Sequence, residues 1–111
     1  MHRADVPQTM PLPFDDDRAP FFTVGQVASI LDVQPAYLRR LDVEEVVQPA
    51  RSDGGQRRYS REEIDLVRHV TSMADAGMTL SSIRRILVLE AEVAQLRGQI
   101  AQLEGRSAHG G

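Results

Sequence analysis

A regular spacing of apolar residues in the C-terminal part of the chain constrains the fold more than any other feature. From Ile86 onward the apolar residues follow one another at intervals of three, four, three, four and three positions, and they are Ile86, Leu89, Val93, Leu96, Ile100 and Leu103. This repeat is typical of the a and d positions of a coiled coil. The flanking e and g positions carry charges: Arg85, Glu90, Glu92, Arg97 and Glu104.

The repeat predicts a helix that begins at Leu80, with Thr79 as its N-cap, and runs to Glu104. The residues after Glu104 are polar or glycine-rich and offer no apolar surface that would cover the seam. We therefore predict a homodimer joined through the six seam residues. The alternative is that the helix packs back on its own domain, which would not require so regular a 3.5-residue period.

Two short predicted helices precede this segment. Thr23 and Gln26 form a capping box for a helix whose apolar stripe comprises Val24, Val27, Ala28 and Leu31. Residues 32–34 make a tight connection, and Pro35 opens a second helix that runs to about Glu44. This arrangement predicts a helix-turn-helix.

The second helix has a core side and an exposed side. Leu38 and Leu41 point to the core, so the other side presents Ala36, Arg39, Arg40 and Val43, with Tyr37 at its edge. This surface would enter a DNA major groove, although a solvated charged face is the alternative.

A β-hairpin is predicted after the second helix. Residues 46–51 are β-branched and then extended, and Ser52-Asp53-Gly54-Gly55 is a turn signal before Gln56-Arg57-Arg58-Tyr59. Arg57 and Tyr59 share one face of the second strand, and Arg58 lies on the other. Consecutive arginines on such a wing would hold DNA phosphates, whereas the alternative is solubilising surface charge.

A further capping box, Ser60 with Glu63, opens a third helix that ends at Gly77. The fold class is therefore predicted to be mainly α: a winged helix-turn-helix with a two-stranded β wing, followed by a long C-terminal dimerisation helix. The predicted domains are an N-terminal arm (1–20), a DNA-binding domain (21–78), a helix and coiled-coil segment (79–104) and a flexible tail (105–111).

The net charge of the chain argues against binding to nucleic acid, whereas the placement of its arginines argues for it. The formal net charge is −3, yet all 13 basic residues are arginines. Six of them fall between Arg39 and Arg61, in the segments predicted to face DNA. Arginine suits phosphates and guanine edges, although a compositional bias explains the absence of lysine equally well.

The remaining composition excludes several functions. The chain has no cysteine, and its histidines, His2, His69 and His109, are not spaced to join carboxylates at a metal or acid–base site. We therefore expect no enzymatic activity, no metal and no cofactor. Without a long apolar run or a secretion signal, we expect a cytoplasmic protein that does not contact the membrane.

Residues 1–20 hold four prolines and Asp15-Asp16-Asp17, which predicts a disordered arm. The arm either competes with DNA or is a solvated tail.

Several local strings, in this order, resemble the MerR family of bacterial transcription regulators across residues 21–104. They are Thr23-Val24-Gly25-Gln26-Val27-Ala28, Tyr37-Leu38-Arg39, Pro49-Ala50-Arg51, Gly55-Gln56-Arg57-Arg58-Tyr59-Ser60 and Gly77-Met78-Thr79-Leu80. The short chain is most similar to the HspR-type heat-shock repressor branch. The resemblance implies an antiparallel coiled-coil dimer on a near-palindromic promoter site in double-stranded DNA, with Arg39, Arg57 and Tyr59 on the DNA side. The complete predicted DNA-binding set is Thr23, Ala36, Tyr37, Arg39, Arg40, Arg57, Arg58 and Tyr59.

The chain also departs from the family pattern. Arg40-Leu41 replaces a usual tyrosine pair, and Glu45 stands where a glycine often ends the second helix, so we expect that turn to differ. Without sensor cysteines or a C-terminal domain, a signal would come from a protein partner such as a DnaK-type chaperone, from temperature or from protein concentration. The predicted function is a dimeric transcription regulator, more specifically a repressor. Alternatives are an excisionase-like or architectural DNA-binding factor and a coiled-coil adaptor with a degenerate helix-turn-helix.

Overall fold

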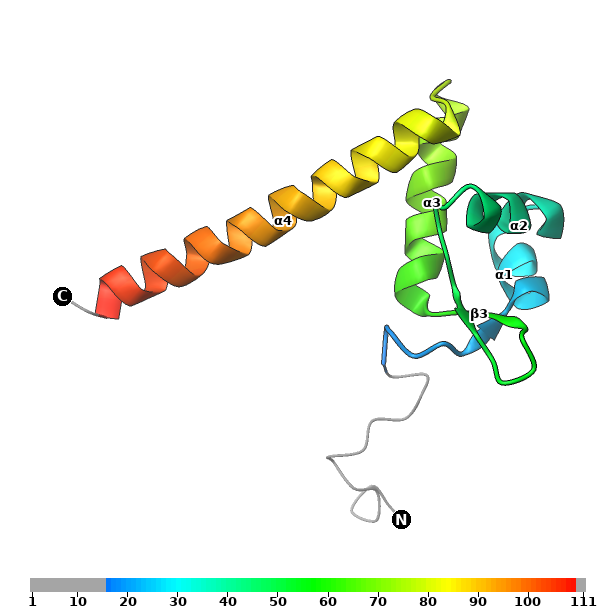
Figure 1. Cartoon of the computed structure of the whole chain (residues 1–111), viewed down its shortest axis with the longest axis horizontal. Helices are drawn as coiled ribbons and strands as arrows, with labels where there is room; N and C mark the ends of the chain where they lie inside the picture. The colour runs from blue at the N-terminus through cyan, green and yellow to red at the C-terminus, as the bar shows by residue number, and fades with distance from the viewer. Residues whose placement is uncertain (1–15, 110–111) are drawn as a thin grey trace, which may run out of the picture.

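The computed structural model describes residues 16–109, so the predicted disorder of residues 1–15 and the last two residues of the predicted tail lie outside it. Seven elements follow in order: β1 (Phe22–Thr23), α1 (Val24–Leu31), α2 (Pro35–Val43), β2 (Ala50–Arg51), β3 (Arg57–Tyr59), α3 (Arg61–Asp75) and α4 (Leu80–His109). Figure 1 shows the elements up to α3 packed into one domain, from which α4 leaves as a straight rod. The mainly helical, winged helix-turn-helix fold is confirmed.

Side-chain caps fix where the helices begin. At α1, Gln26 N donates to Thr23 Oγ1 at 3.1 Å, and Thr23 N donates to Gln26 Oε1 at 2.9 Å. Ser60 and Glu63 exchange the same pair of bonds before α3. Both predicted capping boxes are confirmed, and they satisfy backbone N–H groups that the first turn leaves without partners.

The core of the domain draws on every helix. Its fully buried side chains come from α1, α2, β3, α3 and the first turn of α4, and they are Val27, Leu38, Leu41, Tyr59, Val67, Val70 and Ile83. Because Ile83 is part of this core, the start of α4 is anchored to the domain before the rod departs.

The sheet has three strands, in the order β1-β3-β2, where two were predicted. Phe22 pairs with Tyr59 and Thr23 with Arg58, both antiparallel, while β2 pairs with the other edge of β3. The predicted hairpin of β2 and β3 is present, and the additional strand β1 was missed because it is only two residues long and its partner lies far along the chain. Hairpin signals are local, so they could not reveal this pairing.

Two predicted boundaries also need correction. Residues 16–20 were assigned to the disordered arm, but Glu62 N donates to Asp17 O at 2.9 Å and Asp17 forms an ion pair with Arg61 at 3.8 Å. These contacts join the segment to the first turn of α3. At the other end, α4 continues to His109 instead of ending at Glu104, since no proline follows Glu104 to stop the helix.

The turn after α2 keeps a left-handed residue although it lacks the glycine. Glu45 has a φ of 61°, and Val46 N donates back to Leu41 O at 2.8 Å. Arg84 of α4 reaches this turn, where its Nη1 donates to Glu44 O at 3.2 Å and lies 3.7 Å from Glu45 Oε1. The expectation of a different turn was therefore wrong, and the rod is joined directly to the end of α2.

Candidate nucleic-acid interface

One side of α2 is exposed, as predicted, and we call its four residues the α2 arc: Ala36, Arg39, Arg40 and Val43. The side chains on the opposite side, Leu38 and Leu41, are fully buried. Arg40 forms an ion pair with Glu44 one turn later, at 2.8 Å. No ion pair within residues 16–109 engages Arg39. The arc therefore presents at least one guanidinium whose donors are available to a ligand.

Tyr37 does not belong to this exposed surface. Its hydroxyl oxygen lies 2.9 Å from Thr71 Oγ1 on α3, and its ring packs against the core. The side chain turns toward α3 and links α2 to it, so its position does not support a DNA contact, and the assignment of Tyr37 to the DNA side stays a prediction.

The wing comprises β2, β3 and the loop 52–56 between them, and one of its faces is turned inward. Arg57 and Tyr59 share a face as predicted, but Arg57 Nε donates to Asp42 Oδ2 at 2.6 Å and its side chain is only 18% exposed. Tyr59 is fully buried, its hydroxyl has no hydrogen-bond partner within the described residues, and burial raises the pKa of its phenol. Both side chains therefore point inward in this structure, and their assignment to the DNA side stays a prediction that this arrangement does not support.

The other predicted wing and cap residues lie nearer the surface. Arg58 alternates to the outer face of β3, where it is half-buried and its Nη1 donates to Arg57 O at 3.1 Å. Thr23 is half-buried and accepts the N-cap bond from Gln26. The surface that remains available to DNA consists of the α2 arc, Arg58, Thr23 and the wing loop.

Asp42 was not among the predicted site residues. This carboxylate follows Leu38 by four positions, so it lies on the buried side of α2, and its side chain is 10% exposed. A charged residue at a helical core position is uncommon unless it is paired, and that signal was present in the sequence. Asp42 accepts bonds from both Arg51 and Arg57.

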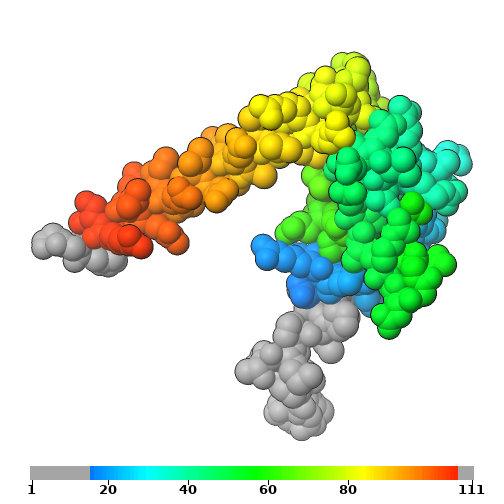
Figure 2. Space-filling view, in the orientation of Figure 1, coloured from blue at the N-terminus to red at the C-terminus, as the bar shows by residue number. Residues whose placement is uncertain are grey.

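The predicted seam of α4 is exposed along most of its length. Exposure is 42% at Leu89, 44% at Val93, 56% at Leu96, 54% at Ile100 and 60% at Leu103, whereas Ile86 packs partly against the core. Figure 2 shows most of the rod standing clear of the domain. A groove along its first half is lined by Ile86, Leu89, Glu90, Val93, Ala94 and Arg97. His69 on α3 reaches this groove, where its Nε2 lies 3.0 Å from Glu90 Oε1.

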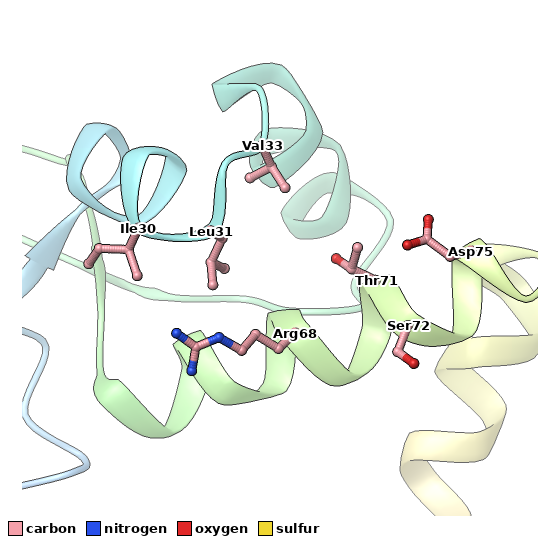
Figure 3. Close-up of a pocket in the computed structure, with 7 residues that line it drawn as sticks. All are labelled: Ile30, Leu31, Val33, Arg68, Thr71, Ser72 and Asp75. Atoms are coloured by element: carbon pink, nitrogen blue, oxygen red, sulfur yellow. The ribbon is translucent and has the colours of Figure 1, made fainter.

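A second groove lies between the α1–α2 connection and α3 (Figure 3). It has an apolar side, formed by Ile30, Leu31 and Val33, and a polar side, formed by Arg68, Thr71, Ser72 and Asp75. None of these residues belongs to the α2 arc, so this groove is separate from the candidate interface. Across residues 16–109, no cluster of three potential metal ligands occurs and no helix is long and apolar enough to cross a membrane.

Comparisons with known proteins agree with this arrangement. The model of the MerR HTH family regulatory proteins matches residues 22–89. The Streptomyces coelicolor protein named heat shock protein HspR is 36% identical over 85 residues, which cover 76% of this chain and 56% of HspR. The chain thus spans about half the length of that relative.

Two solved structures share the fold at low identity. The N-terminal part of MtaN, the Bacillus subtilis multidrug transporter activator, has a TM-score of 0.57 at 22% identity, covering 75% of this chain and 94% of that one. HiNmlR, a MerR family regulator bound to promoter DNA, has a TM-score of 0.55 at 20% identity, covering 75% and 79%. With a family model that spans most of the domain and the start of the rod, the chain belongs to the MerR HTH family of regulatory proteins.

Proposed function

We propose that this protein is a dimeric, sequence-specific DNA-binding transcription regulator. The observation that carries the proposal is the pairing of two exposed surfaces on one rigidly joined unit. The α2 arc presents Arg39 from a short helix, and the α4 seam presents five apolar side chains that are between 42% and 60% exposed. An apolar stripe of this regularity is stable in water when a partner covers it. A second copy would provide an identical stripe and would place two recognition helices, one α2 from each subunit, on one duplex.

The resemblance favours an antiparallel pairing of the rods, and the seam fits one register well. With Ile86 opposite Leu103 of the partner subunit, Leu89 lies opposite the partner's Ile100 and Val93 opposite the partner's Leu96, so all six positions are used. In this register Glu90, at an e position, faces Arg97 of the partner subunit. The two-fold symmetry of the dimer creates the same contact a second time, between Arg97 and the partner's Glu90. A parallel pairing would instead oppose Arg85 with the partner's Glu90 and Glu92 with the partner's Arg97. Charges permit both, so the orientation needs its own test.

DNA binding is tested by selection from fragmented genomic DNA with the purified protein. We expect one duplex to be enriched, with a near-palindromic sequence that matches two copies of the recognition helix. If each subunit contacts roughly three phosphates, the logarithm of the affinity falls with the logarithm of salt at a slope of about −5. Footprints over tandem repeats with monomeric protein would favour an excisionase-like factor, and no enrichment beside a stable protein complex would favour the adaptor.

Arg39 is the residue that best tests the interface. Replacing Arg39 by Ala should lower affinity for the selected duplex by about 10-fold or more, because one base or phosphate contact is lost in each subunit. Arg68→Ala is the matched control, since Arg68 is exposed on α3 and pairs with Asp65 at 2.9 Å. Affinity should stay within about twofold for this variant. Equal losses for the two variants would contradict the proposed interface.

We further propose that this regulator is a repressor that acts on a promoter site. Its support is the similarity to the protein named heat shock protein HspR. A chaperone of the DnaK type remains the proposed regulatory partner. A transcription assay with the selected promoter, with and without a purified DnaK-type chaperone, tests both points. Activation, or repression that the chaperone leaves unchanged, would contradict the respective assignment.

A further inference from the structure

We infer that Asp42 is a positioning residue that holds the wing at a fixed place beside the α2 arc. Its Oδ2 accepts from Arg57 Nε at 2.6 Å and from Arg51 Nη2 at 3.0 Å. Arg51 belongs to β2 and Arg57 to β3. One carboxylate oxygen on α2 therefore binds both strands of the wing.

The two arginines need this anion because of where the sheet places them. Arg51 and Arg57 are directly opposed across β2 and β3, and like charges at opposed positions destabilise a strand pair. The two guanidinium groups alone would carry a net charge of +2, and the Asp42 carboxylate lowers the net charge of the cluster to +1. Arg57 depends on it most, since its side chain is 18% exposed and water offers little alternative solvation there.

The same contacts extend to the tip of the wing. Arg51 Nη1 donates to Gly55 O at 3.2 Å, and Gly55 N donates to Ser52 O at 2.8 Å, which closes the loop. Asp42 directly precedes Val43 of the α2 arc. Its carboxylate therefore sets the separation between the arc and the wing loop, two surfaces that must meet one duplex in a single register. The consequence for DNA rests on the proposed function, whereas the link between α2 and the wing does not.

Asp42→Asn tests the inference, with Asp65→Asn as the matched control. Asp65 also accepts from an arginine, Arg68, at 2.9 Å, but its side chain is 73% exposed and lies on α3. Both variants raise the net charge by one unit, so general attraction to DNA changes equally. We expect Asp42→Asn to lower the ratio of affinity for the selected duplex to affinity for a scrambled duplex about 10-fold. Asp65→Asn should leave the ratio of the two affinities unchanged.

A second measurement needs no DNA. In hydrogen exchange of the free protein, we expect the amides of residues 50–59 to exchange at least about 10-fold faster in Asp42→Asn and at the wild-type rate in Asp65→Asn. If Asp42→Asn does not fold, Asp42→Asn combined with Arg57→Gln removes both buried charges and should show the same two effects.

The outcomes separate the two claims. Unchanged exchange in residues 50–59 would overturn the positioning role, as would faster exchange with an unchanged ratio of specific to scrambled affinity. If the wild-type protein enriches no duplex, the proposed function fails, and the exchange rates alone then decide whether Asp42 holds the wing. Asp42→Glu, which keeps the carboxylate, should retain slow exchange.

Discussion

The hydroxyl oxygens of Tyr37 and Thr71 lie 2.9 Å apart, which joins α2 to α3 by a side-chain hydrogen bond. Tyr37→Phe removes this bond and leaves the Thr71 hydroxyl without its partner. The free energy of unfolding should fall by about 1 kcal/mol. Urea denaturation at a fixed chain concentration measures it, and affinity for the selected duplex should stay within about twofold. A large loss of affinity for the duplex at unchanged stability would mean that the Tyr37 hydroxyl contacts DNA.

Tyr59 gives the opposite prediction for the same substitution. Its buried hydroxyl has no partner within the described residues, so Tyr59→Phe should leave stability unchanged or raise it by up to about 1 kcal/mol. DNA affinity should also be unchanged, because the ring is fully buried. A 10-fold loss of affinity would mean that the hydroxyl reaches DNA.

The pH dependence of stability provides a separate check on Tyr59. Burial raises the pKa of its phenol in the folded protein, so the unfolded chain ionises first as the pH rises. The stability that this pKa difference provides is fully present below the pKa of the phenol in the unfolded chain, which is about 10. It is lost as the pH rises through the pKa of the phenol in the folded protein. Wild-type protein should therefore lose more stability than Tyr59→Phe on going above pH 10. Identical alkaline profiles would contradict the burial of the phenol.

The left-handed Glu45 predicts a stabilising substitution. Glu45→Gly relieves a conformation with φ of 61°, and it should raise the free energy of unfolding by about 0.5–1 kcal/mol after the greater flexibility of glycine in the unfolded chain is counted. Asp32 has a φ of 54°, but aspartate tolerates this region better, so Asp32→Gly should gain less. Thermal denaturation of both variants tests the comparison, and a larger gain at Asp32 would contradict it.

The orientation of the rods can be decided by exchanging two charges. In the antiparallel register, Glu90→Arg or Arg97→Glu alone places like charges at both symmetric contacts, which should weaken dimerisation by about 5- to 30-fold. The double variant restores opposite charges and should recover most of the affinity. In a parallel dimer the double variant would instead oppose Arg85 with Arg and Glu92 with Glu. Further weakening of the double variant, measured by sedimentation equilibrium, would therefore contradict the antiparallel arrangement.

Much of the fold could be predicted from local patterns. The capping boxes at Thr23 and Ser60 fixed two helix starts because the bonds involve residues only three positions apart. The sides of α2 followed from the helical period. The strand at Phe22 was missed because its pairing with Tyr59 is long-range and leaves no local signal.

The candidate site was predicted less completely. Alternation along β3 placed Arg57 and Tyr59 on one face, but it cannot say which face is turned inward. The resemblance placed them on the DNA side, and the structure places one in the core and the other against Asp42. Which face is buried is decided by the packing of α1 against β1 and β3 and by the bonds from the wing arginines to Asp42 of α2, and sequence spacing does not encode these contacts.

Sedimentation equilibrium of two valine variants of α4 tests the central claim, that the seam joins two copies of the chain. Val93 is 44% exposed in the seam, and Val88 is 45% exposed on the same helix, at an outward c position. Wild-type protein and Val88→Glu should be dimers at micromolar concentration, whereas Val93→Glu should dissociate about 100-fold more readily because each dimer would bury two glutamates. Monomeric wild-type protein, or equal effects of the two substitutions, would contradict the account.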